Sequence, residues 1–177
     1  LTLSNSTWRV GPFRIFEELP QWSAPNSEVS YLSLPDWLES LTIESITGEG
    51  AMLNAADVSG MLEDFFGEPA TCTITGRGGS GSFSFGVDNL TGGQSQIHVD
   101  KAQIEIDGGF EGKEGLYLIE AKKHLSLDFN VRQLYYPYRT WSSKVTKPVR
   151  PVFATLANDV YELTEFRFND PENLSSI

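Results

Sequence analysis

Cysteine and histidine are scarce in this sequence of 177 residues. Its single cysteine, Cys72, excludes a disulfide within the chain and a zinc site built from cysteines. Its two histidines, His98 and His124, leave little for a histidine-rich metal site. Because Cys72 stands in an apolar stretch, we expect a buried structural side chain there rather than a nucleophile.

Long hydrophobic runs are also missing. No apolar stretch approaches the roughly 20 residues that a helix needs to cross a bilayer, so we expect no membrane partner and a cytoplasmic protein. Hydrophobic residues make up 40% of the chain and charged residues 21%, which is typical of a globular domain. A chain of this size can bury a sizeable core without help from disulfides or metals.

Positive charge is in short supply, and its distribution is uneven. The formal net charge is −11, which by itself argues against a nucleic-acid partner. Residues 121–150, however, hold seven bases and one acid, so this segment carries +6 and the remainder −17. Such asymmetry can mark a side that faces nucleic acid, or it can be an ordinary solvated face.

The order of predicted elements indicates an α/β or α+β fold with a mixed β-sheet flanked by helices. Prolines punctuate residues 1–46, where we expect an irregular, β-containing N-terminal extension packed on a core of residues 47–177. Periodicity predicts helices over 47–66 and 129–141, and strands over 70–75, 82–87, 96–107, 115–122, 149–156 and 160–168. The last two strands are joined by a turn at Asn158 and Asp159. Since Leu1 is not a start methionine, we expect a piece of a longer protein.

A glycine-rich stretch at residues 76–81 satisfies the pattern GxGxxG. A dinucleotide site needs a strand before this pattern and a helix after it. Here the next residues, 82–87, alternate as a strand does, so we interpret the stretch as a hairpin loop.

The most informative stretch is QIEIDGGFEGKEGLYLIEAKK, residues 103–123. Side chains alternate along a strand, so Glu120 and Lys122 share a face. Folding residues 103–122 into a hairpin about the polar centre at 113–114 places Asp107 across from Glu120, with Cα atoms about 5 Å apart. The same register leaves Ile104, Ile106, Tyr117 and Ile119 on the opposite, apolar face.

Two carboxylates this close repel each other unless a cation lies between them. Mg²⁺ binds one or two carboxylates together with waters and phosphate oxygens, and the carbonyl of Ala121 could add a ligand. A lysine on the same face could orient a water or stabilise developing negative charge. The arrangement favours metal-assisted attack of water on a phosphodiester.

Asp107 followed by Glu120-x-Lys122 resembles the core motif of the PD-(D/E)xK nuclease superfamily. The surrounding elements resemble the α-β-β-β-α-β core of its restriction-endonuclease-like fold. Among members, the chain is most similar to the catalytic domain of type II restriction endonucleases. Ile106 stands where the motif has proline, and Pro137 stands where related exonucleases have a tyrosine four residues after Gln133.

The resemblance implies a bacterial, Mg²⁺- or Mn²⁺-dependent endonuclease that acts on DNA, with a homodimer or a further domain of the same chain as partner. It implies metal binding by Asp107, Glu120 and Ala121, with Lys122 as a further catalytic residue. Many members add an acid from the first helix, for which Glu49 and Glu63 are candidates; Glu49 is preferred because it stands near the helix start. Contacts with the nucleic acid are expected from Lys123, Arg132, Gln133, Arg139 and Lys144. Nearby aromatic residues, Tyr135, Tyr136, Tyr138 and Trp141, either pack in the core or stack near the site.

Two other interpretations compete. An acid followed at this spacing by ExK is common by chance, and Glu105 could form an ordinary cross-strand pair with Lys122. The chain could then be an acidic, β-rich protein-interaction module. It could also be a nuclease fold that binds DNA but has lost catalytic activity.

Overall fold

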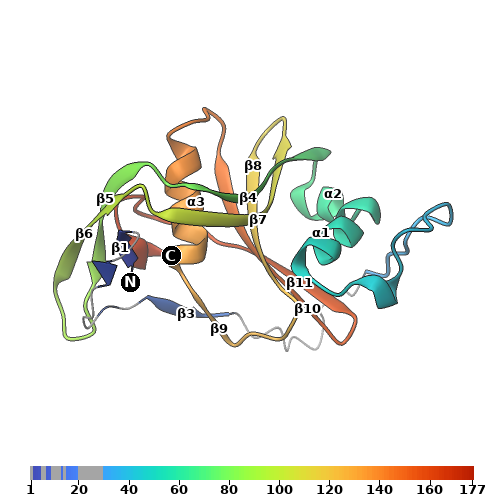
Figure 1. The fold of residues 1–177 in the computed structure, drawn as a ribbon, viewed down its shortest axis with the longest axis horizontal. Coiled ribbons are helices and arrows are strands. Elements are labelled where there is room, and N and C mark those ends of the chain that lie inside the picture. Colours follow the sequence, from blue (N-terminus) through green and yellow to red (C-terminus); the bar gives the residue numbers. More distant parts are fainter. Residues whose placement is uncertain (1, 5–6, 9–12, 14, 20–29) are drawn as a thin grey trace.

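The computed structural model describes residues 2–4, 7–8, 13, 15–19 and 30–177. It shows a mixed α+β fold built around a five-stranded sheet (Figure 1). The helices are α1 (Glu49–Val58), α2 (Met61–Phe66) and α3 (Arg132–Ser142). The sheet strands are β4 (Ala70–Gly79), β7 (Gln103–Gly112), β8 (Leu116–Lys122), β10 (Val149–Ala157) and β11 (Val160–Glu165). The expected mixed sheet with flanking helices is therefore confirmed.

The strand order in the sheet is β11-β10-β8-β7-β4. Strand β7 pairs antiparallel with both β4 and β8, whereas β10 pairs in parallel with β8 after the chain has passed through α3. Strand β11 returns antiparallel to β10. A helix lies in the connection between the parallel pair, as is usual for a parallel crossover.

Helices cover both faces of the central strands, so β8 is apolar on both sides (Figure 1). Tyr117, Ile119 and Ala121 join a core cluster with α1 and α2. Leu116 and Leu118 join the other cluster, which contains Leu134 and other residues of α3. Because side chains alternate along a strand, Glu120 lies on the same face of β8 as Leu116 and Leu118, which is the face toward α3.

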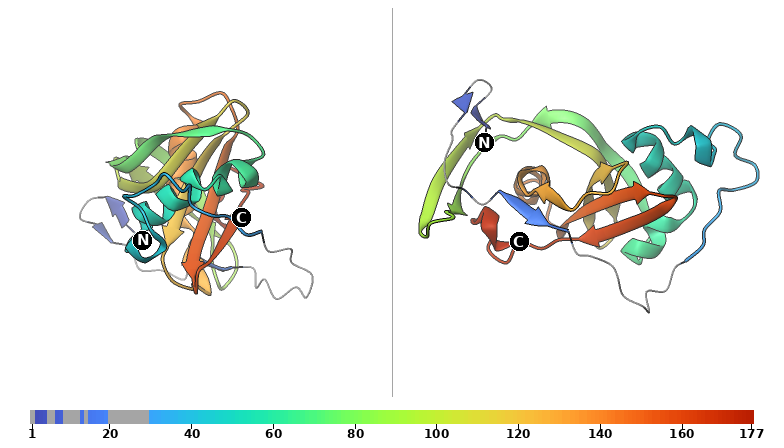
Figure 2. Two further views of the ribbon diagram at one scale, coloured as in Figure 1. Left: turned by 90° about the vertical axis from the view of Figure 1, so that its right-hand side faces the viewer. Right: turned by 90° about the horizontal axis from the view of Figure 1, so that it is seen from below.

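A two-stranded hairpin, β5 (Ser82–Asp88) and β6 (Gln94–Asp100), is inserted between β4 and β7. It packs on α3 through edge-to-face rings, Phe83 on Tyr136 and Phe85 on Tyr135. The views in Figure 2 place this hairpin and the α1–α2 pair at opposite ends of the molecule. The hairpin therefore forms an arm beside α3.

Short elements complete the described chain. Strands β1 (Thr2–Ser4) and β2 (Thr7–Trp8) pair with each other, and β3 (Phe16–Glu18) pairs with β9 (Asp128–Asn130). Single 3-10 turns lie at Ile43–Ser45 and Leu174–Ser176. Residues 20–29 of the expected extension lie outside the described residues. In the described part of the chain, no helix has the length and apolar character needed to cross a membrane.

Several predicted boundaries were wrong. The expected helix 47–66 is two helices, because Gly60 adopts a left-handed conformation with φ of 80°. The expected strand 96–107 is divided at Lys101, which has φ of 49°. The second predicted helix begins at Arg132 rather than at 129 and contains Pro137. The turn at Asn158 and Asp159 is confirmed, with φ of 51° and 61°.

The glycine-rich stretch is not a loop in most of its length. Strand β4 continues through Gly76, Gly78 and Gly79, which pair with β7 residues from Ile106 to Gln103. Because β4 is the edge of the sheet, its side chains gain little cover, and Cys72 is exposed rather than buried. The prediction of a buried Cys72 was therefore wrong.

Candidate functional site

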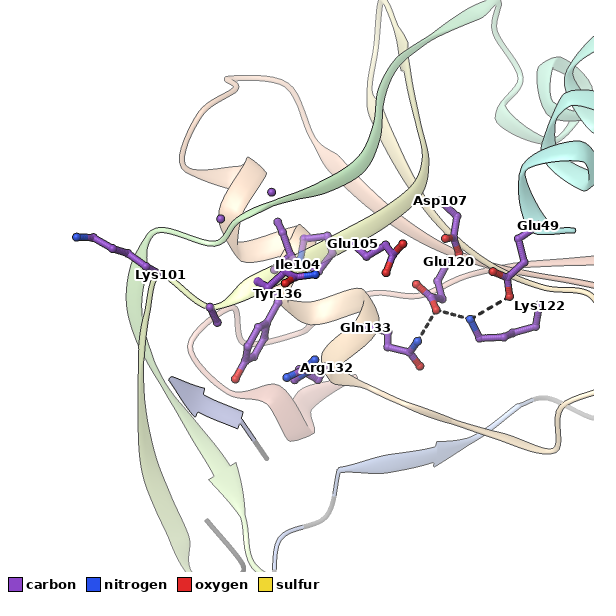
Figure 3. A pocket seen from close by; sticks show the side chains of 15 residues that line it. Glu49, Lys101, Ile104, Glu105, Asp107, Glu120, Lys122, Arg132, Gln133 and Tyr136 are labelled. Atoms are coloured by element: carbon purple, nitrogen blue, oxygen red, sulfur yellow. Dashed lines mark hydrogen bonds and ion pairs between the residues drawn. The ribbon is translucent and has the colours of Figure 1, made fainter. Parts of the chain in front are cut away.

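A pocket of about 630 Å³ lies where β7, β8, α1 and α3 meet (Figure 3). The volume is in the range typical of ligand-binding clefts. Acidic side chains line one part of it and basic side chains another. The lining residues are Glu49, Gly78, Gly79, Lys101, Ala102, Gln103, Ile104, Glu105, Asp107, Glu120, Lys122, Arg132, Gln133, Tyr136 and Pro137.

The register of β7 and β8 brings Asp107 beside Glu120. The observed pairs, such as Gly108 with Ile119, follow the predicted register, and its next step sets Asp107 opposite Glu120. There Oδ2 of Asp107 accepts a hydrogen bond of 2.8 Å from the backbone N–H of Ala121. The carboxylate thus satisfies a main-chain donor at the end of the paired region.

The apolar face expected for this hairpin is divided between two cores. Tyr117 and Ile119 pack with α1 and α2, whereas Ile104 and Ile106 pack in the cluster with α3. The register of β4 on β7 shifts on either side of Ile74, and such irregularities locally bend and twist strands. The simple alternation that we predicted for β7 therefore fails before Asp107.

Glu120 is the most enclosed acid of the site, with 8% of its side chain exposed. Its Oε1 lies 2.6 Å from Nζ of Lys122 and accepts a hydrogen bond from Nε2 of Gln133 on α3. The same Lys122 ammonium donates to the carbonyl of Ala121 at 3.0 Å. Lys122 and Gln133 together fix the orientation of the Glu120 carboxylate.

Glu49 joins this group from a different element. It is the first residue of α1, and its Oε1 lies 3.4 Å from Nζ of Lys122. The alternative acid, Glu63, is exposed on α2 and does not line the pocket. Of the two candidates from the helical region, the structure places Glu49 beside the predicted site residues (Figure 3).

Burial and like charge disturb the titration of these groups. Burial raises the pKa of Glu120 to about 7; the hydrogen bond from Lys122 opposes this rise and the charge of Asp107 adds to it. Burial also raises the pKa of Asp107, although the Ala121 N–H lowers it. Burial alone would lower the pKa of Lys122, but the hydrogen bond and charge of Glu120 outweigh burial and raise it. Perturbed groups that share a cleft are typical of functional sites.

The donor set suits a hard cation bound partly through water. In the described part of the chain, no group of three or more His, Cys, Asp or Glu side chains is arranged to hold a metal ion. Mg²⁺ does not need such a group, because it retains several waters and binds one or two carboxylates. Asp107 and Glu120, with the carbonyl of Ala121, supply that set, and a cation would offset the like charge that raises the pKa of Glu120.

The predicted nucleic-acid contacts are divided. Arg132 and Gln133 line the pocket. Lys123 follows β8 and is exposed, and Nζ of Lys144 lies 4.6 Å from the ring centroid of Trp141. Arg139 does not line the pocket. Its guanidinium lies 2.8 Å from the Glu172 carboxylate and donates to the carbonyl of Pro171.

The basic segment does not gather its charge at the pocket. Lys147 pairs with Glu111 at 2.8 Å, and Arg150 pairs with Glu165. Arg150 lies opposite Tyr117, five residues along β8 from Lys122, or about 17 Å away. Acids distant in sequence thus neutralise part of the +6 segment, and these bases do not add to the positive charge at the pocket.

Sequence reasoning missed several lining residues. Lys101, Gly78 and Gly79 were not named as site residues, and Glu105 was named only as a possible partner of Lys122. Glu105 instead pairs with Arg77 at 3.3 Å. The glycine-rich stretch was the available signal, because glycines in a strand often mark a close approach by a ligand or a backbone.

Comparisons with known proteins identify the family but no activity. No curated protein and no solved structure matches the chain. A family model described as Domain of unknown function (DUF6997) matches residues 11–177, which is most of the chain. The protein therefore belongs to the DUF6997 family.

Proposed function

We propose that this domain is a Mg²⁺-dependent endonuclease that hydrolyses DNA phosphodiester bonds, as part of a type II restriction or defence enzyme. The observation that carries the proposal is the meeting of Asp107, Glu120 and Lys122 in one pocket, joined by Glu49 from α1. The strand register alone would bring Asp107, Glu120 and Lys122 together. The position of Glu49 is independent of that register, because it depends on how α1 packs. Such a set suits metal-assisted hydrolysis.

The connectivity supports the same proposal. The chain passes from α1 and α2 through β4, β7 and β8 into α3 and then β10. This order agrees with the α-β-β-β-α-β core of restriction-endonuclease-like proteins, with the β5–β6 hairpin as an insertion between its first two strands. The motif residues occupy the second and third strands of that meander.

Each side chain has a role in the proposed reaction. Asp107, Glu120 and the Ala121 carbonyl would hold Mg²⁺ or Mn²⁺, which when bound lowers the pKa of a coordinated water and offsets phosphate charge. Lys122 orients the attacking water and stabilises negative charge on the phosphate. Gln133 holds the Glu120 carboxylate in place, and Glu49 holds the Lys122 ammonium.

The test is cleavage of DNA by the protein with Mg²⁺ present. Asp107→Asn, Glu120→Gln and Lys122→Ala should each lower the cleavage rate by about two to four orders of magnitude. Glu49→Gln should lower it less, because Glu49 acts through Lys122. Glu63→Gln removes an equal charge from α2 outside the pocket and should leave the rate unchanged.

The outcomes separate the competing interpretations. Equal cleavage by the parent and the three pocket variants would show that the motif is not catalytic. DNA binding without cleavage under any divalent metal would identify a catalytically silent nuclease fold.

One observation favours an additional role in protein contact. Tyr31 and Trp37 are 93% and 75% exposed, and Ile43 nearby is 63% exposed. We infer that these side chains contribute to one apolar surface, and contiguous exposed apolar patches are typical of surfaces that another protein covers. This supports the proposal of a partner, either a second copy or a further domain of the same chain. A dimer disrupted by Trp37→Ser in sedimentation measurements would identify the second copy.

A further inference from the structure

Arg132 differs from the other arginines of the described chain. Arg77, Arg139, Arg150 and Arg167 each lie within ion-pair distance of an acid. Among the described residues, no acid lies within that distance of Arg132. Its guanidinium instead lies over the ring of Tyr136, 5.2 Å from the centroid.

The position of Arg132 makes its unpaired charge available to a ligand. It is the first residue of α3 and lines the pocket, and the next residue, Gln133, contacts Glu120. Figure 3 shows Glu120, Gln133 and Arg132 following one another, with Arg132 on the side away from Lys122 and Glu49. The pocket therefore has an acidic end and, adjoining it, a position with uncompensated positive charge.

Tyr136 supports the guanidinium without neutralising it. Its ring is 1% exposed and packs edge-to-face on Phe83 of the β5–β6 hairpin. Its hydroxyl is buried and has no hydrogen-bond partner in the described structure. An aromatic face orients an arginine while leaving its N–H groups free, and those groups match phosphate oxygens in a bidentate manner.

The opposite wall of the pocket is open backbone. Gly78 and Gly79 belong to β4, the edge strand of the sheet, and both line the pocket. A Cβ added at either residue would meet no atom within 4 Å. From Asp107 to Gln103, the paired strand β7 extends over about 13 Å, which equals about four base-pair steps of rise along the axis of duplex DNA.

We propose that the Arg132 end of the pocket is a phosphate subsite for the strand that is cut. Arg132 binds a phosphate adjoining the scissile one, and the strand passes between Arg132 and the bare backbone of Gly78 and Gly79. The inference rests on the proposed nuclease function, since the acidic end supplies the reaction. The DNA strand would then run from the acidic end of the pocket toward the β5–β6 hairpin.

The experiment measures DNA binding by fluorescence anisotropy, with EDTA or with Ca²⁺ in place of Mg²⁺, over a range of salt. Arg132→Gln should weaken binding of a labelled single strand about tenfold and lower the slope of log affinity against log salt by about one. Lys113→Gln removes an equal charge at the β7–β8 turn and should change neither quantity. Tyr136→Phe should bind as the parent does, whereas Tyr136→Leu should weaken binding.

Two valine variants test the open wall. Neighbouring strand residues point to opposite faces, so Gly78→Val and Gly79→Val serve as controls for each other. We expect both variants to fold with parental stability, because each Cβ meets open space. One of them should lose DNA affinity by blocking the strand, and parental affinity in both would overturn the proposed path.

The results distinguish this inference from the nuclease proposal. If the protein binds DNA and Arg132→Gln binds as tightly as Lys113→Gln, the subsite is wrong while the nuclease proposal stands. If Arg132→Gln weakens binding but the parent never cuts DNA, Arg132 is a phosphate contact of a DNA-binding site, and both the catalytic proposal and the assignment to a cut strand fail. No DNA binding in EDTA or in Ca²⁺ would overturn both.

Discussion

Lys122 and Glu120, two residues apart on β8, form an ion pair with 2.6 Å between Nζ and Oε1 (Figure 3). The same ammonium donates to the carbonyl of Ala121. These are two of the three groups proposed to hold Mg²⁺. Lys122 therefore offsets part of the negative charge of the site in the absence of metal, and it would have to move for a cation to bind Glu120 and the Ala121 carbonyl.

Lys122→Met should separate metal binding from catalysis. Removal of the ammonium removes the competitor for Glu120 and the Ala121 carbonyl, so Mg²⁺ should bind several-fold more tightly while DNA cleavage is lost. Isothermal titration with Mg²⁺ measures the affinity, and the rise in melting temperature with Mg²⁺ provides a second readout. Lys113→Met, at an exposed turn, should leave Mg²⁺ affinity unchanged. Weaker Mg²⁺ binding by Lys122→Met would show that Lys122 supports the metal site.

The metal-free protein should lose stability as pH rises through the range where Glu120 titrates. The folded pKa of about 7 lies above the ordinary value of 4.5, so between these values the folded state retains a proton that the unfolded state releases. The free energy of unfolding therefore falls with pH in this window. The shift corresponds to about 3 kcal/mol in total.

Glu120→Gln isolates this contribution. Its free energy of unfolding, relative to the parent, should rise by about 3 kcal/mol between pH 4.5 and 8 in urea titrations with EDTA. Glu63→Gln, an exposed acid on α2, should follow the parent at each pH. A pH profile of Glu120→Gln parallel to that of the parent would mean that Glu120 is not perturbed in the folded protein.

Arg139 should stabilise the fold rather than bind DNA. Its side chain is 14% exposed and joins α3 to the C-terminal segment through Glu172 and the carbonyl of Pro171. Arg139→Gln should lower the free energy of unfolding by about 1.5–3 kcal/mol, which is the contribution of hydrogen bonds to charged groups. Its DNA affinity, measured below the unfolding transition, should equal that of the parent. A salt slope reduced by about one would instead place Arg139 on a phosphate.

The β10–β11 turn offers a stabilising substitution. Asn158 and Asp159 both adopt positive φ, which suits a type I′ turn, and glycine is the preferred second residue there. Asp159→Gly should raise the free energy of unfolding by roughly 0.5–1 kcal/mol, because a residue with a Cβ is strained in this conformation. Chemical denaturation measures the change. Asn158→Ala is the opposite test and should be destabilising.

Local pattern was enough to place the central hairpin. A polar, glycine-containing turn between two apolar strands permits few registers, because a slip of one residue moves buried side chains into solvent. The observed pairing of Gly108 with Ile119 agrees with the predicted register. The proximity of Asp107 to Glu120 could therefore be predicted, and so could the shared face of Glu120 and Lys122.

Prediction failed where a distant contact decides the conformation. The glycines after Ile74 have the composition of a loop, yet Gly76, Gly78 and Gly79 are held in β4 by hydrogen bonds to β7. The bases of residues 121–150 form a positive run in sequence, yet several are neutralised by acids from other elements, as Lys147 is by Glu111. In both cases the residue that decides the conformation or the charge is distant in sequence.

The sequence by itself determined the alternation of β8 and the spacing of Asp107, Glu120 and Lys122, since each depends on strand geometry over a few residues. Only the tertiary structure decided which acid joins them, because α1 packs on the sheet and brings Glu49 to Lys122, while the turn at Gly60 directs Glu63 to solvent. It also decided that no acid of the described residues lies within ion-pair distance of Arg132, since that depends on how every other element packs around α3. The interaction between two charges depends on their distance in space. A count of charges along the sequence therefore cannot predict which of them form ion pairs.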